Sequence, residues 1–194
     1  MSKNVMDYLS MNEVILTRQH NYSNINKKYI DAINSIYSSD KYVQMSIFDV
    51  DGKKYYCVLI MRGIYLEPHF GVFIDDSFNQ LTNALTSNDS DKIRELLLSD
   101  NILAKDGYTN DDSNLFKILS YVFSILTDYL TKKQIAFVKI MGNPKKFSIY
   151  NKIVSKNISQ IPYRIIIREQ SDQYSNKFGE VTSAKSMILK YKFA

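Results

Sequence analysis

Residues 111–156 constrain the fold of this chain more strongly than any other stretch. Residues 111–133 carry apolar side chains at steps of three and four, which predicts a long helix with one wide buried face. A short, mainly apolar run at residues 135–141 then predicts a strand that packs under this helix. After a turn glycine, Asn143 precedes Pro144, and this pair supplies an N-cap and a proline suited to the first helical position. A second helix is therefore expected to begin at Pro144.

The clearest hairpin in the sequence surrounds the dipeptide Asp51-Gly52. Residues 42–50 and 53–61 are rich in apolar and aromatic side chains on either side of it. Asp-Gly is favoured in type I′ turns because both central residues of such a turn need a positive φ angle. Residues 64–74 continue with apolar side chains and predict a third strand, in which the single proline indicates a bulge or a sheet edge.

The remaining elements complete an α+β pattern. Helices are expected at residues 24–37, 77–85 and 89–98, and strands at residues 163–169 and 186–193, which a polar loop at residues 170–183 separates. We interpret residues 1–40 as an N-terminal helical arm, residues 42–193 as the core and residues 75–112 as a polar helical excursion. No repeat or linker divides residues 1–194, which predicts a single domain. The expected fold class is α+β, with a mixed, largely antiparallel sheet and packed helices.

Composition excludes several classes of site. No run approaches the roughly 18 apolar residues of a membrane span, and the N-terminus lacks the apolar core of a signal peptide, so a cytoplasmic protein without membrane contact is expected. One cysteine, Cys57, and two histidines, His20 and His69, are too few for a disulfide framework or a Cys/His zinc site. Cys57 lies within an apolar strand and is expected to be buried and inert. Asp49 and Asp51 are interpreted as turn residues, and no metal site is predicted.

Charge is distributed unevenly along the chain. Residues 1–131 hold 12 Lys and Arg against 17 Asp and Glu, whereas residues 132–194 hold 13 against 3, so their formal charges are −5 and +10. A candidate binding set gathers seven of the basic residues: Lys139, Lys145, Lys146, Lys152, Lys156, Arg164 and Arg168. A solvated basic face explains this set, and so does contact with an acidic protein or with a polyanion. Nonspecific nucleic-acid binding through the basic C-terminal third is one form of the polyanion hypothesis.

The order of three antiparallel strands, a long helix, a strand, a second helix and two final strands resembles the GNAT acyltransferase superfamily. The resemblance is strongest at residues 135–150, where Asn143 follows a strand and Tyr150 comes seven residues later. Together with Lys145 and Lys146, this segment also resembles uncharacterised GNAT-like proteins of phages and some bacteria. That resemblance implies a phage-encoded protein of the host cytoplasm or the virion.

For an active member, the resemblance implies acetyl coenzyme A as cofactor, Tyr150 as general acid and Glu67 or His69 as general base. It also implies an open cleft between the fourth and fifth strands. The loop before the long helix, however, reads YTNDDSNL and lacks the superfamily's glycine-rich phosphate signature. Asp111 and Asp112 place negative charge where the coenzyme phosphates would lie.

Three functional hypotheses follow. The leading one is a non-enzymatic protein-interaction or assembly protein that uses no cofactor. The first alternative is an acyltransferase that uses acetyl coenzyme A, and the second is a nonspecific nucleic-acid-binding protein.

Overall fold

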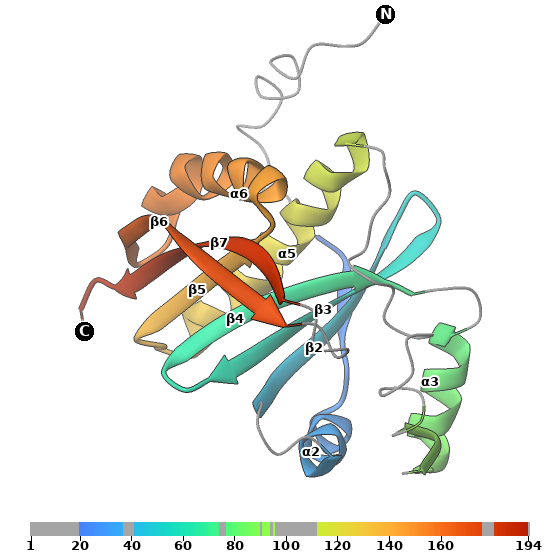
Figure 1. The fold of residues 1–194 in the computed structure, drawn as a ribbon. Helices are drawn as coiled ribbons and strands as arrows, with labels where there is room; N and C mark the ends of the chain where they lie inside the picture. The colour runs from blue at the N-terminus through green and yellow to red at the C-terminus, as the bar shows by residue number, and fades with distance from the viewer. Residues whose placement is uncertain are drawn as a thin grey trace, which may run out of the picture.

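A seven-stranded mixed sheet runs through the described part of this computed structural model (Figure 1). The described residues are 20–36, 41–73, 77–89, 91–93, 95, 112–175 and 181–193. The strands are β1 (Tyr22–Asn24), β2 (Lys41–Val50), β3 (Lys53–Arg62), β4 (Tyr65–Val72), β5 (Phe137–Gly142), β6 (Tyr163–Ser175) and β7 (Val181–Tyr191). They are ordered β1-β2-β3-β4-β5-β7-β6, and neighbouring strands are antiparallel except for β4 and β5, which are parallel.

Helices cover the sheet on both sides, so the α+β prediction is confirmed. They are α2 (Lys27–Ile36), α3 (Ser77–Ser87), α5 (Asp112–Lys132) and α6 (Pro144–Asn157), and a short 3-10 turn at Ile158–Gln160 follows α6. In Figure 1, α6 lies above the sheet and α5 passes behind it, while α2 and α3 lie below it near strands β2 and β3. Among the helices described, none has both the length and the apolar character that crossing a lipid bilayer requires.

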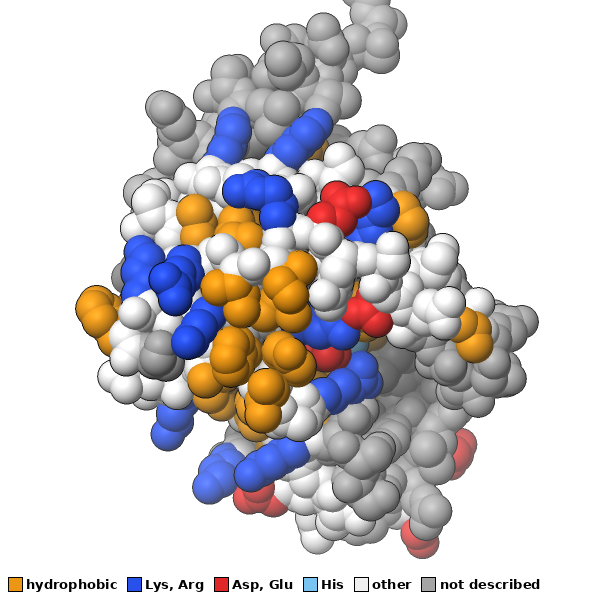
Figure 2. Space-filling model, turned by 60° about the vertical axis from the view of Figure 1, so that its left-hand side comes forward, with side chains coloured by type: hydrophobic (Ala, Val, Ile, Leu, Met, Phe, Trp, Pro, Cys, Tyr) orange, Lys and Arg blue, Asp and Glu red, His pale blue; other side chains and the backbone are white. Residues whose placement is uncertain are grey.

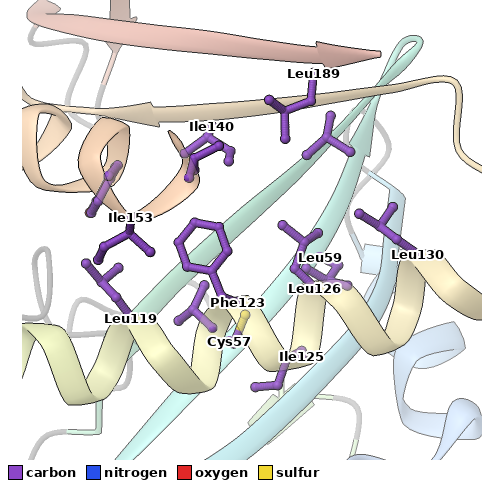
Figure 3. Packing of buried hydrophobic residues seen from close by; sticks show 14 of the residues in the cluster. Cys57, Leu59, Leu119, Phe123, Ile125, Leu126, Leu130, Ile140, Ile153 and Leu189 are labelled. Atoms are coloured by element: carbon purple, nitrogen blue, oxygen red, sulfur yellow. The ribbon is translucent and has the colours of Figure 1, made fainter. Parts of the chain in front are cut away.

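The main core fills the space between α5, α6 and the sheet. Figure 3 shows Phe123 and Leu126 of α5 pointing toward Leu59 of β3 and Ile140 of β5, with Ile153 of α6 closing one side. These five side chains are all buried. The apolar steps of three and four that predicted the helix therefore do mark its buried face.

Three local predictions are confirmed by backbone geometry. Asp51 and Gly52 have φ angles of 50° and 78°, as a primed hairpin turn requires. Asn143 caps α6, since its side-chain oxygen accepts a hydrogen bond of 2.9 Å from the backbone N–H of Lys146. Pro144 takes the first helical position, where no backbone donor is lost.

Two elements differ from the prediction. The expected polar loop at residues 170–183 instead lengthens the last hairpin, because residues 170–175 pair with residues 181–186. A two-stranded ribbon can carry polar side chains, because backbone hydrogen bonds between its N–H and C=O groups hold the two strands together. The helix expected at residues 24–37 begins later than predicted, at Lys27. Asn24 lies instead in the short strand β1, where it pairs with Ser46 of β2.

The sequence predicted a bulge or a sheet edge at Pro68. The structure has no bulge there, but β4 lacks a neighbour on its β5 side at this residue. Strand β4 keeps a regular register with β3 through Pro68, but it pairs with β5 only through Tyr65 and Leu66. Pro68 thus lies where β4 has already separated from β5, and its missing N–H costs no ladder hydrogen bond there. The N-terminal arm before His20, most of the helix expected at residues 89–98, and the loop at residues 96–111 lie outside the described residues.

Candidate functional site

One half of the sheet carries side chains that no described helix covers. α2 and α3 pack on β2 and β3 through a second core, which includes Ile33, Tyr56, Ile60 and Leu81. Beyond β3, strands β4, β5, β7 and β6 direct alternate side chains to this same side, away from α5 and α6. We call these side chains the open face: Tyr65, Glu67, Phe137, Lys139, Arg164, Ile167, Ser186, Ile188 and Lys190. Ile166 lies beside them at an irregularity of β6, where it has no partner in the register with β7.

Strand register places two aromatic rings and two cations in one line across the open face. Tyr65 pairs with Phe137, Phe137 with Lys190, and Lys190 with Arg164. The rings of Tyr65 and Phe137 lie 5.9 Å apart, and the Lys190 ammonium lies 5.9 Å from the centre of the Phe137 ring. Neither Arg164 nor Lys190 forms an ion pair with a carboxylate among the described residues. This line therefore presents aromatic surface next to uncompensated positive charge.

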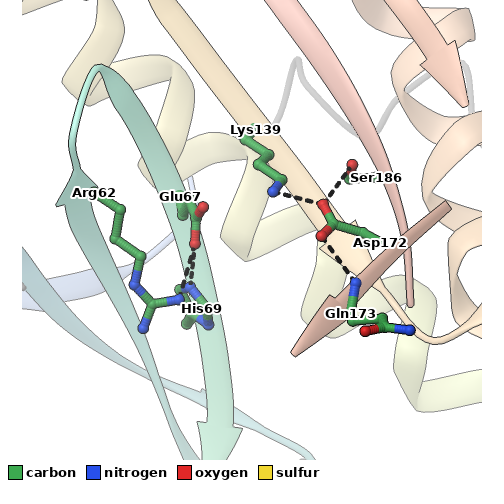
Figure 4. Close-up of polar contacts among 7 residues, drawn as sticks. All are labelled: Arg62, Glu67, His69, Lys139, Asp172, Gln173 and Ser186. Atoms are coloured by element: carbon green, nitrogen blue, oxygen red, sulfur yellow. Dashed lines mark hydrogen bonds and ion pairs between the residues drawn. The ribbon is translucent and has the colours of Figure 1, made fainter. Parts of the chain in front are cut away.

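A buried carboxylate lies beside this line on β4 (Figure 4). Glu67 is 6% exposed, and its Oε2 accepts a hydrogen bond of 3.1 Å from the Arg62 guanidinium and lies 3.2 Å from His69 Nε2. Burial alone raises the pKa of Glu67, but the hydrogen bond with His69 and the charges of His69, Arg62 and Lys139 outweigh it, so the net pKa is lowered. Glu67 is therefore held as a carboxylate.

A second carboxylate joins β5, β6 and β7. Asp172 accepts from the Lys139 ammonium at 2.5 Å, from the Ser186 hydroxyl at 3.0 Å and from the backbone N–H of Gln173 at 2.9 Å (Figure 4). Partial burial raises the pKa of Asp172, while these hydrogen bonds and the Lys139 charge lower it overall. Both acidic groups next to the open face are therefore already neutralised by their own neighbours.

The predicted basic set is divided between the two sides of the sheet. Lys139 and Arg164 belong to the open face, whereas Arg168 turns to α6 and donates hydrogen bonds to Ser155 Oγ at 2.7 Å and Asn151 Oδ1 at 3.3 Å. Lys146, Lys152 and Lys156 are carried by α6 on the opposite side of the sheet, and the side chain of Lys145 lies outside the described part. The seven residues do not form one surface.

The predicted acid and base candidates also lie on different sides. Tyr150 of α6 is 6% exposed and packs edge-on to Phe70 of β4, with ring centres 6.4 Å apart. Because side chains alternate along a strand, Glu67 and His69 leave β4 on the side opposite to Phe70. Tyr150 thus lies close to the point where β4 and β5 stop pairing. It does not lie next to Glu67 or His69.

Apolar side chains line the space between β4 and β5. A cavity of about 20 Å³ is bordered by Pro68 and Phe70 of β4, Ile140 of β5, Phe123 of α5 and Tyr150. This volume has room for about one water molecule. β4 pairs with β5 only through Tyr65 and Leu66, and the rings of Phe70, Phe123 and Tyr150 line the space beyond this pairing.

Most open-face residues escaped the sequence analysis. Residues 186–193 were predicted as a strand, and alternation along it places Ile188 and Lys190 on the side opposite to Met187 and Leu189. Whether Arg62, Tyr65 and Phe137 lie at this site depends on which strands become neighbours in the sheet. Local sequence patterns do not predict the strand order. Among the described residues, no three His, Cys, Asp or Glu side chains gather as a metal site would require.

The chain matches no family model, no curated protein and no solved structure.

Proposed function

We propose that this chain is a non-enzymatic interaction protein that binds a protein partner through the open face, on a GNAT-like scaffold. The scaffold part of the proposal is supported by the strand order β1-β2-β3-β4-β5-β7-β6 and by a β4–β5 pairing that ends after Leu66. The binding part is carried by one observation, the half of the sheet that neither α2 nor α3 covers.

The chemistry of the open face supports a protein ligand. Its apolar centre is the half-buried ring of Phe137 beside Ile188, which is 5% exposed, and Ile166, which is 44% exposed, lies next to them at the irregularity of β6. Figure 2 shows apolar side chains gathered in the middle of this side of the molecule, with Lys and Arg side chains around them. Protein interfaces typically combine such an apolar centre, often with aromatic and arginine residues, with a polar rim. Contiguous exposed apolar surface of this kind marks an interaction site more often than chance.

The small volume of the cavity between β4 and β5 supports a non-enzymatic role. Acyl transfer needs a reacting acyl group held beside the catalytic acid and base. Phe70, Phe123 and Tyr150 line this small cavity, and the candidate bases leave β4 on the other side of the sheet. The described geometry thus favours binding over transfer.

Site-specific photo-crosslinking tests the proposal directly. A benzophenone amino acid is placed at Phe137 on the open face and, as a control, at the exposed Ser148 of α6, in protein expressed in its natural host. We expect one defined protein adduct from position 137 and none from position 148. The adduct is then purified and its binding remeasured with Phe137→Asp. Equal labelling from both positions, or adducts with nucleic acid only, contradict a protein partner at this face.

The acyltransferase alternative is favoured by one observation, the divergence of β4 and β5 next to Tyr150. It predicts that acetyl coenzyme A raises the melting temperature in a saturable manner, because a ligand of the folded state stabilises it by mass action. The interaction hypothesis predicts no shift. A saturable shift, followed by loss of acyl transfer in Tyr150→Phe, establishes the alternative.

A further inference from the structure

We infer that the partner presents a single amphipathic α-helix to the open face, with an apolar stripe over Phe137 and acidic side chains on Arg164 and Lys190. This inference rests on the proposed function and adds the chemistry of the partner to it. Three features of the described residues carry it: the width of the uncovered sheet, the form of the β6 edge, and the sign of the uncompensated charge.

The uncovered part of the sheet has the width of one helix. β4, β5, β7 and β6 span three interstrand spacings, or about 14 Å at roughly 4.8 Å each. An α-helix with its side chains is about 10–12 Å across. α2 and α3 already form a helical layer over β2 and β3, on the same side of the sheet (Figure 1). One further helix beside them continues that layer across the open face.

The sheet edge next to the open face is poorly suited to an added strand. β6 is the outermost strand, and its register with β7 is interrupted twice, between Ile165 and Ile167 and again between Ile167 and Gln170. Bulges and charged side chains on an edge strand discourage pairing with another strand. Arg164, Arg168 and Glu169 provide such charges here. The partner therefore contacts the face of the sheet and not its edge.

The charge of the open face selects an acidic partner. Arg164 and Lys190 are directly opposite each other on neighbouring strands, where like charges repel. The nearby carboxylates do not relieve this repulsion, because Glu67 is paired with Arg62 and Asp172 with Lys139. Carboxylates of a bound helix would neutralise both cations at once.

Charge also argues against a second copy of this chain as the partner. A two-fold interface places the same surface patch on both subunits. Two open faces in contact would bring two Arg164–Lys190 pairs together without an acidic group for either. A heterologous partner with acidic flanks avoids this cost.

The test uses three synthetic peptides of about 18 residues, long enough for five helical turns. The first has leucine at i, i+3, i+4 and i+7 spacing with flanking glutamates, the second has lysine in place of each glutamate, and the third is the first with its order scrambled to remove the apolar stripe. Binding to the full chain is followed by fluorescence anisotropy, with a fluorescent oligothymidine as a fourth probe. We expect the acidic helix to bind at least about tenfold more tightly than the other peptides and the oligonucleotide.

Charge-reversal variants locate the binding. Arg164→Glu with Lys190→Glu is expected to reverse the preference, so that the basic helix binds about tenfold more tightly than the acidic one. The matched control, Lys152→Glu with Lys156→Glu on α6, changes net charge equally and is expected to leave the preference unchanged. Thermal melts of each variant confirm folding. Absence of acidic-helix binding, equal binding by the scrambled peptide, tighter binding by the oligonucleotide, or an unchanged preference in the open-face variant each overturns the inference.

The crosslinking result separates this inference from the proposed function. A protein adduct at position 137 together with failure of the acidic helix overturns the inference and leaves the proposed function standing. Failure of both measurements overturns both.

Discussion

Tyr55 holds its hydroxyl group in the core with no hydrogen-bond partner among the described residues. The side chain is 0% exposed, and burial, followed by the charge of Asp51, raises its pKa. A buried hydroxyl without a partner costs about 1–3 kcal/mol of desolvation, whereas the ring contributes packing against Phe48. Tyr55→Phe is therefore expected to leave the free energy of unfolding unchanged or to raise it by about 1 kcal/mol in urea titrations.

Tyr163 provides the matched control for this prediction. Its side chain is equally buried, but its hydroxyl donates a hydrogen bond of 2.7 Å to the backbone oxygen of Ile135. Tyr163→Phe leaves that oxygen without its donor and is expected to lower the free energy of unfolding by about 1 kcal/mol. Equal losses from the two substitutions would show that the Tyr55 hydroxyl has a stabilising contact after all.

Glu67 makes stability depend on pH. Its pKa in the folded state is lowered from the ordinary value of 4.5, so the carboxylate contributes stability that is fully present above 4.5 and is lost as pH falls through the folded value. Glu67→Gln resembles the protonated residue at every pH. We expect the variant to unfold more easily than the wild type at pH 7 and the difference to shrink below about pH 4.5. Urea titrations between pH 7 and 3 measure it, and a difference that is constant with pH contradicts the assignment.

The junction of β5 and α6 depends on the absence of a side chain at residue 142. A Cβ added to Gly142 would lie 2.7 Å from Cε2 of Tyr150, closer than real Cβ contacts allow. Because Tyr150 is packed against Phe70, its ring has little freedom to move. Gly142→Ala is expected to lower the free energy of unfolding by about 1–3 kcal/mol. In a Tyr150→Leu background the cost should fall, and a double-mutant cycle measures this coupling. Independent effects would show that the ring relaxes freely.

Elements were predictable where their signals are local. The turn residues Asp51 and Gly52, the cap at Asn143 and the apolar face of α5 each depend on neighbours within a few positions, and the structure confirms all three. The extension of β6 was missed because its polar residues 170–175 are held by backbone pairing with β7, which side-chain polarity does not reveal. Local signals thus predict which elements form better than they predict how long those elements are.

The open face was unpredictable for a related reason at the scale of the molecule. Its central line joins Tyr65, Phe137, Lys190 and Arg164 from four strands, and it exists only because β4 pairs with β5 and β7 lies between β5 and β6. Lys139 and Arg164 were recognised as basic residues, but their faces depend on strand alternation, and Arg168 was grouped with them although it contacts α6. The charge asymmetry of the sequence showed which part of the chain is basic, but it did not show which surface the basic residues form.

Because of the charge asymmetry along the chain, the substitution Arg164→Glu is expected to stabilise the folded protein and to weaken binding of the acidic helix. Strands β5, β6 and β7 all come from the basic part of the chain, and Arg164 and Lys190 repel each other across the last hairpin. Arg164→Glu converts this pair to opposite charges and is expected to raise the free energy of unfolding by about 0.5 kcal/mol at low salt. Because ions screen exposed charges, the gain should nearly vanish at about 1 M salt. Urea titrations at both salt concentrations measure it.

Arg168→Glu is the control, since Arg168 donates hydrogen bonds to Asn151 and Ser155 of α6 and its replacement should destabilise the chain. Residues selected for binding are often not optimal for stability, because a site must leave charges or apolar groups unsatisfied for its ligand. Arg164 fits that description if its substitution stabilises the free protein while weakening its complex with the acidic helix. A destabilising Arg164→Glu would instead show that Arg164 supports the fold, and the open face would lose the uncompensated charge on which its partner's chemistry was inferred.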